Sequence, residues 1–305
     1  MTIFEPMLAA TLDAEGQLTR WPYLASPKLD GVRCVVKDSC AYSRNLKPIR
    51  NGHIQDLLSV RRLNNLDGEL VVGAPHGGDV FNRTQSGVMR LEGTPRFTFY
   101  VFDDFTSPVR DFNYRLGCAE DRIDDFNEVY VSHVEHTLVH NLADLQQYER
   151  IVLEQGYEGV MLRAPAAPYK FGRATAKEGF MWKLKRFTDG EAVVLRIEEG
   201  SHNENTAERD ELGRTKRSTA KAGQVKSGLL GTLISQDVRT GAEMRISPGR
   251  LTREQREYYM KHPKELVGKL INYRSFEYGV KDAPRFANFQ SFRDPATLSR
   301  APATV

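Results

Sequence analysis

The chain has 305 residues, of which 40% are hydrophobic and 27% are charged, and its formal net charge is +3. These values are ordinary for a soluble globular protein, and the length is sufficient for two domains that each bury a core. No run reaches the roughly 18 apolar residues of a membrane helix, and the N-terminal residues lack the pattern of a secretion signal. We therefore expect an intracellular protein without a membrane partner.

The cysteines and histidines form no disulfide or metal pattern. Cys34, Cys40 and Cys118 have no C-x-x-C spacing, which argues against a structural zinc site and a disulfide framework. Cys34 is expected to be a small core residue. Four histidines that occur singly or in a polar strand are expected at the surface: His76, His133, His136 and His140.

The first part of the chain alternates between strand and helix patterns. Apolar residues with helical spacing lie between Ile54 and Leu63, and the aromatic-rich run at 97–105 is typical of a strand buried on both faces. Asn141 can cap a helix that Gly156 ends. The predicted elements are a hairpin over 34–44, a helix over 53–65, a strand over 97–105, a helix over 142–155, and strands over 158–164 and 180–186.

Beyond about Thr188 the pattern changes to short strands separated by turn residues. Thr252 and Gln255 have the spacing of a capping box at the start of a helix over 252–261. Several short strands with one helix are typical of a Greek-key barrel of the OB type. The last residues, 295–305, lack apolar periodicity and are expected to be disordered. The predicted strands cover 191–200, 230–238, 243–249 and 269–279.

A long polar segment interrupts this second pattern. Residues 201–228 are glycine-dotted, and the part from Arg214 to Lys226 contains five basic residues and no acidic one. A basic run by itself usually indicates a solvated surface. A loop of this length inside a compact domain, however, tends to be functional or disordered.

The sequence KLDGVR, which begins at Lys28, combines a lysine with a nearby aspartate and arginine at the end of an apolar run. A single lysine at such a position normally extends its charge to the surface. It becomes a nucleophile when burial and neighbouring cations destabilise its ammonium form, since the ordinary lysine pKa is about 10.4. Gly31 would let the backbone approach a ligand closely.

The remaining candidates follow in chain order. Glu69 is expected beside a glycine turn at the start of a strand, and Glu158 at the start of another. Lys183 and Lys185 have the period of a strand, which puts both on one face. Each signal is weak by itself, and their order along the chain is the informative feature. The short motifs are KLDGVR (28–33), SRN (43–45), DGEL (67–70), FDD (102–104), EGVM (158–161) and WKLK (182–185).

These motifs resemble those of the covalent lysyl-nucleotidyltransferases, which include ATP-dependent DNA ligases, RNA ligases and mRNA capping enzymes. The runs YKFGRATAKEG (169–179), TKRSTAKAG (215–223) and KDAPRFANFQSFRD (281–294) extend the resemblance to the minimal viral ATP-dependent DNA ligases. The resemblance implies an α+β fold. It implies a nucleotidyltransferase (adenylation) domain of antiparallel sheets with flanking helices over 1–189, followed by an OB-fold β-barrel over 190–294.

The resemblance also implies the reaction, its cofactors and its partner. Lys28 would attack the α-phosphate of ATP, AMP would pass to the 5′-phosphate of a nick in duplex DNA, and the 3′-hydroxyl would then displace it. Lys183 and Lys185 would face the α-phosphate and help Lys28 to lose its proton. Glu69 and Glu158 would hold Mg²⁺, an ion that prefers oxygen ligands. The enzyme would act as a monomer that clamps the DNA.

The other implied roles concern the nucleotide and the DNA. Asp30 would orient the 3′-end of the nick, and Ser26 would lie near the adenine, where relatives often carry threonine or glutamate. Arg33 and Arg44 would contact ribose or the nick phosphate. Phe102 would stack on adenine, and Arg173 would contact the 5′-phosphate. Arg285 would align pyrophosphate, and Arg293 is a second functional residue of the same motif. The cations of the latch-like loop 201–228 would contact DNA phosphates: Arg214, Lys216, Arg217 and Lys221.

The sequence leaves several alternative functions open. An RNA ligase or an mRNA capping guanylyltransferase shares the lysine motif, although the basic loop and the last motif favour a DNA ligase. An NAD-dependent ligase would be expected to have an additional N-terminal domain and a cysteine-bound zinc. Another alternative is a non-catalytic nucleic-acid clamp built on an OB fold. Such a protein would not need the two carboxylates Glu69 and Glu158, nor the two lysines Lys183 and Lys185 on one face of a strand.

Overall fold

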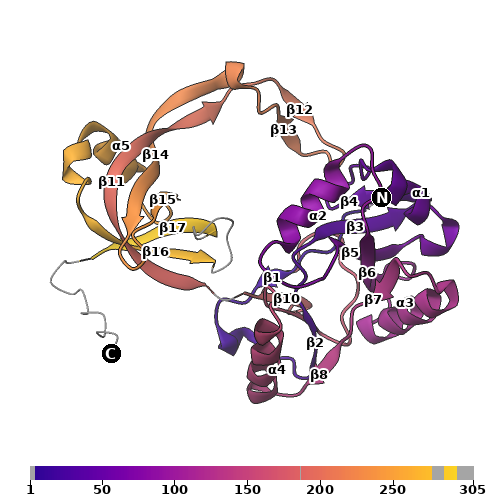
Figure 1. The fold of residues 1–305 in the computed structure, drawn as a ribbon. Helices are drawn as coiled ribbons and strands as arrows, with labels where there is room; N and C mark the ends of the chain where they lie inside the picture. The colour runs from indigo at the N-terminus through magenta and orange to yellow at the C-terminus, as the bar shows by residue number, and fades with distance from the viewer. Residues whose placement is uncertain (1–3, 186, 277–284, 294–305) are drawn as a thin grey trace. The chain divides into compact units, whose positions relative to one another are not determined.

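The computed structural model describes residues 4–185, 187–276 and 285–293. The chain divides into two compact units (Figure 1), residues 1–185 with 211–213 and residues 186–210 with 214–305. Within the described residues, no helix is long and apolar enough to cross a membrane.

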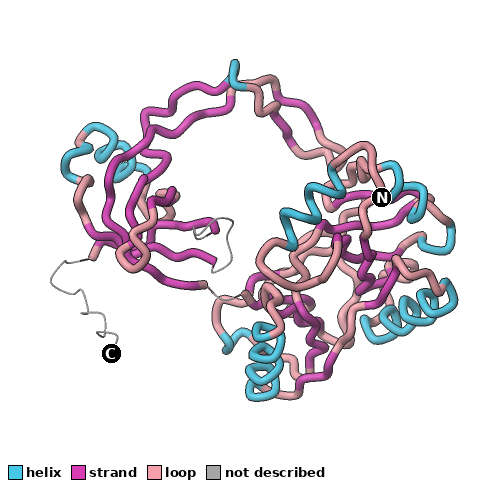
Figure 2. Tube along the Cα trace, viewed as in Figure 1, coloured by secondary structure: helices cyan, strands magenta, loops and turns pink. Residues whose placement is uncertain are grey.

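The described residues of the first unit form two five-stranded sheets and four α-helices, together with two short 3₁₀ turns. Figure 2 shows the helices of this unit in cyan and the strands in magenta. Its α-helices are α1 (Gly52–Leu58), α2 (Val80–Met89), α3 (Phe112–Phe126) and α4 (Leu142–Glu154), and its 3₁₀ turns are η1 (Glu15–Gln17) and η2 (Arg61–Leu63). Its strands are β1 (Ala10–Thr11), β2 (Tyr23–Pro27), β3 (Val32–Lys37), β4 (Cys40–Ser43), β5 (Leu66–Val72), β6 (Phe97–Asp104), β7 (Val131–His133), β8 (Thr137–Val139), β9 (Val160–Arg163) and β10 (Met181–Leu184).

Each sheet of the first unit has its own core. One sheet has the strand order β4-β3-β5-β6-β7, and α3 lies beside β6 and β7 (Figure 1). The other has the order β1-β10-β9-β2-β8 and packs against α4. Most neighbours are antiparallel, while β6 with β7 and β1 with β10 run parallel. Cys34 lies in the first core, as expected, and is fully buried.

Several predicted elements are confirmed together with their local causes. The hairpin joins β3 to β4 through Asp38 and Ser39, both at positive φ. Asn141 caps α4 by accepting a hydrogen bond from the backbone nitrogen of Asp144 at 3.0 Å. Gly156, at φ +85°, follows the end of that helix, a conformation that glycine adopts without steric cost.

Other elements differ from the prediction. The helix expected over 53–65 ends at Leu58, because Ser59 leaves the helical conformation and the β-branched Val60 is extended. The strand at 97–105 was expected to be buried on both faces, but along β6 buried and half-buried side chains alternate. Gly68 is not in a turn; it lies inside β5, at a bulge where a Cβ atom would come within 2.3 Å of the Tyr100 carbonyl oxygen of β6.

The second unit is built on one five-stranded sheet with the order β15-β14-β11-β16-β17. The backbone nitrogen of Ser247, just beyond β15, donates to the Ala287 carbonyl at 2.9 Å, and Phe289 donates back to Ser247 at 3.0 Å. Both partners of Ser247 belong to β17, so backbone hydrogen bonds link the two edges of the sheet. The elements are β11 (Thr188–Asn203), β12 (Ala207–Arg209), β13 (Thr215–Arg217), η3 (Lys221–Gly223), β14 (Gln224–Asp237), β15 (Glu243–Ile246), α5 (Arg253–Lys261), η4 (Pro263–Glu265), β16 (Leu270–Phe276) and β17 (Arg285–Phe292).

The polar segment 201–228 is more regular than a loop. The long strands β11 and β14 pair as far as Asn203 and Gln224, and β12 pairs with β13 beyond them. The segment has few apolar residues, so its composition predicts a loop. Its strands are held by backbone hydrogen bonds, which do not depend on the type of side chain. The helix α5 begins, as expected, with a capping box between Thr252 and Gln255.

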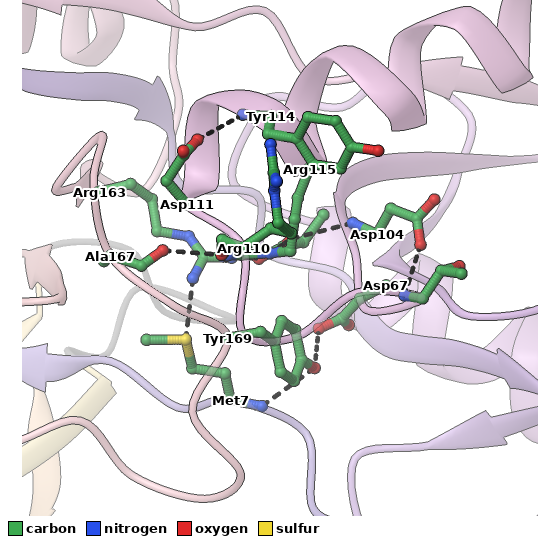
Figure 3. Close-up of polar contacts among 12 residues, drawn as sticks. Met7, Asp67, Asp104, Arg110, Asp111, Tyr114, Arg115, Arg163, Ala167 and Tyr169 are labelled. Atoms are coloured by element: carbon green, nitrogen blue, oxygen red, sulfur yellow. Dashed lines mark hydrogen bonds and ion pairs between the residues drawn. The ribbon is translucent and has the colours of Figure 1, made fainter.

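Buried ion pairs connect the two sheets of the first unit. Asp103 of β6 accepts hydrogen bonds from Arg115 of α3, at 2.8 Å and 3.2 Å, and from Arg163 of β9. Arg115 and Arg163 are 1% and 2% exposed, so both charges lie in the interior. Arg115 also donates to the Ala167 carbonyl at 3.0 Å, a contact visible in Figure 3.

We predict that Asp103→Asn lowers the free energy of unfolding of the first unit by about 3–5 kcal/mol, because two buried guanidinium groups lose their counter-charge. The matched control is Asp79→Asn, which breaks the exposed pair between Asp79 and Arg83 and should cost less than about 1 kcal/mol. Urea denaturation followed by circular dichroism measures both. Equal losses for the two variants would contradict the role given to the buried pairs.

Candidate active site

A cavity of about 290 Å³ lies in the first unit, and its walls contain most of the site residues predicted in that unit. Cations, a carboxylate and apolar side chains meet there, and both sheets contribute. The lining residues are Leu8, Ala9, Ser26, Pro27, Lys28, Leu29, Arg33, Arg44, Glu69, Phe102, Val134, His136, Met161, Arg163, Arg173, Met181 and Lys183.

Lys28 lies just beyond β2, and its backbone nitrogen donates to the Gly159 carbonyl at 2.8 Å. Its ammonium group and that of Lys185 each donate to one carboxylate oxygen of Glu158. The Lys28 side chain is 23% exposed and that of Glu158 is 11% exposed, so the pair is partly shielded from solvent. The lysine is therefore held inside the cavity wall, with a carboxylate as its direct partner.

The charges around Lys28 shift the pKa values of their neighbours. Burial by itself would raise the pKa of Glu158, but Lys28 and Lys185 outweigh it and the pKa is lowered. Burial lowers the pKa of Lys183, and the nearby cations Arg173 and Lys28 lower it further. Burial also lowers the pKa of Lys185. Lys183 and Lys185 thus bind their protons less tightly than lysines in water do.

Glu69 lies on β5, where its backbone is paired with that of Arg33 on β3. Burial raises the pKa of Glu69 to about 7, although Arg33 and Lys28 act in the opposite direction. Glu158 is near enough to contribute to this shift. Two carboxylates beside a cavity fit Mg²⁺, which binds few protein ligands and otherwise uses water and phosphate oxygens. Within the described residues, no group of three or more histidine, cysteine, aspartate or glutamate side chains forms a metal cage.

Arg33 is fixed by a network that was not predicted. Asp67 accepts two hydrogen bonds from Arg33, both at 2.6 Å, and a third from the Tyr169 hydroxyl at 2.5 Å. The Tyr169 oxygen in turn accepts from the Met7 backbone nitrogen at 3.1 Å (Figure 3). The guanidinium group of Arg33 lies over the Phe102 ring at 4.6 Å. The Arg33 guanidinium group therefore covers one face of the Phe102 ring, and a base that stacks on this ring must use the opposite face.

The other predicted residues of this unit are distributed around the cavity. Ser26 is 4% exposed and lines the wall. Arg44 and Arg173 are exposed residues at the cavity, and Arg173 donates to the Ala9 carbonyl at 2.9 Å. Asp30 is outside the lining set, although its charge acts on Lys185.

Gly31 has a different role from the expected one. A Cβ atom at this position would lie 2.2 Å from the Leu70 carbonyl oxygen and 2.8 Å from the Glu69 side chain. The glycine therefore allows its own chain to pass close to β5. Gly31 is not among the residues that line the cavity, so the expected close approach to a ligand is not what requires it.

One cavity residue was wrongly assigned to the surface. His136 is half-buried and lines the cavity. Its Nδ1 lies 2.8 Å from the Val134 carbonyl oxygen. Burial, followed by the charge of Arg163, lowers its pKa to about 4. The short link between β7 and β8 carries this residue, and its polar surroundings in sequence gave no sign of the burial.

The predicted DNA contacts of the second unit lie in the segment 201–228. Arg214, Lys216, Arg217 and Lys221 are all exposed. Arg217 also donates to the Asn205 carbonyl across the segment. In the last motif, Arg285 begins β17, but its side chain is outside the described residues. Arg293 pairs with Glu191 at 2.9 Å.

Comparison with known proteins identifies the family. The sequence model of the ATP dependent DNA ligase domain matches residues 6–185. The DNA ligase of Halobacterium salinarum is 29% identical over an alignment 219 residues long, which covers 63% of this chain and 37% of that protein. This chain thus spans little more than a third of the length of its curated relatives.

Solved structures match nearly the whole chain. The crystal structure of Chlorella virus DNA ligase-adenylate is 30% identical, covers 96% of this chain and 100% of its own, and has a TM-score of 0.55. A Lig E DNA ligase structure with 23% identity and a TM-score of 0.69 covers 96% of this chain and 100% of its own, and it supports the mixed α and β fold. The predicted resemblance is therefore confirmed, and the chain belongs to the family of the ATP-dependent DNA ligase domain.

Proposed function

We propose that this protein is an ATP-dependent DNA ligase that seals nicks between a 3′-hydroxyl and a 5′-phosphate in duplex DNA. The observation that carries the proposal is the position of Lys28 at the wall of the cavity, in contact with Glu158 and close to Lys183. Membership of the ligase family supports the same assignment. ATP and duplex DNA are both found inside cells, so the proposed reaction is intracellular.

The first step forms a bond between Lys28 and AMP. The Nζ lone pair attacks the α-phosphorus of ATP, the bond from that phosphorus to the bridging oxygen breaks, and pyrophosphate leaves. The Lys28 ammonium group loses one proton before the attack and the nitrogen loses a second after the new bond forms, and both protons pass to solvent. Because phosphoryl transfer depends mostly on positioning and on neutralising charge, Lys183 and Lys185 are proposed to stabilise the oxygens of the α-phosphate.

Glu158 controls when Lys28 can react. An ammonium group has no lone pair to donate, so Lys28 must first lose a proton, and it does so more readily once Glu158 no longer stabilises the charged form. Glu69 and Glu158 would hold Mg²⁺, which neutralises phosphate charge when bound. A carboxylate that moves from Lys28 to another cation releases the lysine for attack.

The next two steps use the same cavity. The 5′-phosphate of the nick attacks the phosphorus of lysyl-AMP, which breaks the nitrogen–phosphorus bond and gives adenylated DNA. The 3′-hydroxyl then attacks the 5′-phosphate, and AMP leaves. We propose that Arg44 and Arg173 bind the nick phosphate and that Asp30 orients the 3′-end. Ser26 and Phe102 lie at the proposed base site, and Arg33 would contact ribose or phosphate.

The second unit is proposed to bind DNA and to help in the first step. We infer an OB-fold barrel over 190–294 that follows an adenylation domain over 1–189. The hydrogen bonds between Ser247 and β17, which link the sheet edges, support a barrel, as does α5 between the third and fourth of its five strands. Arg285 would align pyrophosphate, and Arg293 would assist. The protein is proposed to act as a monomer.

The segment 201–228 is proposed as the DNA latch. Its exposed cations occur on β13 and η3 and on the adjoining turns. Contacts to phosphates are independent of sequence and weaken with salt. Such contacts suit an enzyme that has to seal nicks in any sequence. The residues proposed to make them are Arg214, Lys216, Arg217 and Lys221.

The protein is expected to acquire label from ATP carrying ³²P at the α-phosphate, and nicked duplex DNA should then remove it. Lys28→Arg should abolish labelling, because a guanidinium group is not a nucleophile. Lys37→Arg, on the exposed pair with Asp38, is the matched control and should label normally. Gel electrophoresis after denaturation measures the label. Better labelling by GTP, or labelling of Lys28→Arg, would contradict the proposed function.

Glu69 gives a prediction that couples stability to pH. Its pKa in the folded protein is about 7, above the ordinary value of 4.5, so the charge of Glu69 increasingly destabilises the fold as the pH rises from about 4.5 to about 7, and the loss stays constant above that. Glu69→Gln should raise the free energy of unfolding at pH 8 by about 1–2 kcal/mol, and the gain should vanish near pH 4.5.

The same variant should lower the rate of lysyl-AMP formation by roughly a hundredfold, because a metal ligand is lost. Glu128→Gln, an exposed carboxyl on a loop, is the control for both measurements. Urea denaturation at the two pH values and labelling kinetics provide the readouts. A variant that is destabilised at pH 8, or that labels at the normal rate, would be inconsistent with the proposed role.

The latch is tested by removing charge without shortening the chain. The double variant Lys216→Gln/Lys221→Gln should form lysyl-AMP normally but bind nicked DNA less tightly, and its salt-dependence slope should fall by about 2. Lys264→Gln, an exposed lysine in η4, is the control. Filter binding at several salt concentrations measures the slope.

Deletion of residues 203–226 is a second test of the latch. It should spare adenylylation of the enzyme and impair nick sealing; equal loss of both steps would argue against a latch.

A further inference from the structure

We propose that His136 determines the choice of base, by accepting a hydrogen bond at Nε2 from the 6-amino group of adenine. The inference rests on the proposed function, because it assigns one contact within the proposed nucleotide site. His136 lies outside the motifs that carry the family resemblance.

The hydrogen bond at the other ring nitrogen fixes the tautomer. Nδ1 of His136 lies 2.8 Å from the carbonyl oxygen of Val134. A carbonyl oxygen only accepts, so Nδ1 must carry the hydrogen. In a neutral imidazole the second nitrogen is then an acceptor. Within the described part of the chain, the ring has no second hydrogen-bond partner, so Nε2 is available to a ligand.

The surroundings keep the ring neutral. Burial and the charge of Arg163 both favour the uncharged form and lower the pKa of His136 to about 4. His133 acts in the same direction, and Asp103 opposes it. Asp103 is, however, already paired with Arg115 and Arg163. A neutral ring with a bare Nε2 is therefore the form present near neutral pH.

The ring is also held in orientation. His136 meets Phe112 edge to face, with 5.5 Å between the ring centroids. Arg163 lies over Phe112 at 4.5 Å, and Phe112 itself is fully buried. Together with the bond to Val134, these contacts prevent the ring from turning freely. A fixed acceptor discriminates between ligands better than a mobile one does, because it cannot turn away from a repulsive group.

The cavity lining contains side chains suited to phosphate and side chains suited to a base. The cations Lys28 and Lys183 suit phosphates, whereas apolar side chains such as Val134 and Met161 suit a purine. The uncharged polar side chains of the lining are Ser26 and His136, and His136 is the one whose other polar atom is already bonded, which leaves Nε2 as an acceptor. Adenine carries an amino donor at position 6, and guanine carries an oxo acceptor there. An acceptor at Nε2 attracts the first and repels the second.

The experiment compares ATP with purine riboside triphosphate, which lacks the 6-amino group, and with GTP. The full-length protein is mixed with each nucleotide and Mg²⁺, and the addition of one nucleoside monophosphate is followed by intact-protein mass spectrometry. The wild-type protein should prefer ATP over purine riboside triphosphate by about tenfold to a hundredfold in rate constant divided by KM. His136→Leu should reduce this preference to about onefold, while His140→Leu, at an exposed histidine, should retain it.

A second variant keeps the test decisive if His136→Leu does not fold. In His136→Gln the amide offers an oxygen to adenine or a nitrogen to guanine. It should keep the preference for ATP over purine riboside triphosphate and lose much of the preference for ATP over GTP. Variants that accept a nucleoside monophosphate and keep the wild-type preferences for ATP over purine riboside triphosphate and over GTP would overturn the role of His136. The proposed function would stand in that case. Absence of any nucleotide on the wild-type protein would overturn the proposed function, and this inference with it.

Discussion

The site depends on one carboxylate shared between two lysines. Glu158 accepts hydrogen bonds from both Lys28 and Lys185, and it stays ionised because these cations outweigh the effect of burial. The same contact holds Lys28 at the cavity and, in the proposed reaction, favours its unreactive ammonium form. We regard Glu158 as a switch in which the carboxylate leaves the lysine when a competing cation arrives with the nucleotide. Such an arrangement would protect the amine from reaction until the substrate is in place.

The cavity keeps its shape because its supporting charges are paired in the interior. Asp67 fixes Arg33, and Tyr169 fixes Asp67. Asp103 joins β6 to β9 through Arg163, which lines the cavity and also lies close to His136. Buried ion pairs add little net stability when compared with apolar packing, but breaking one of them is costly. They therefore specify one arrangement of the two sheets, which positions the cations around Lys28.

The sequence predicted the local elements better than the contacts between them, and it named several residues that the structure places around one cavity. Capping residues and strand periodicity identified α4, α5 and the β3–β4 hairpin, because their causes lie within a few residues. The helix α3 was not predicted, although its buried residues have helical spacing. The partnership of Asp67 with Tyr169 joins residues 102 positions apart, and no local pattern encodes it. His136 was missed because a polar neighbourhood in sequence does not indicate burial in the fold, and the strands in 201–228 were missed because backbone pairing has no side-chain signature.

The central claim is that Lys28 is the nucleophile that accepts AMP. Tandem mass spectrometry of peptides, prepared at alkaline pH after incubation with ATP and Mg²⁺, tests it most directly because acid would cleave the bond between nitrogen and phosphorus. The account predicts one AMP per chain, on the Nζ atom of Lys28, with Lys183 and Lys185 unmodified. AMP on either of those lysines or on any other residue, or a chain that acquires none, would contradict it.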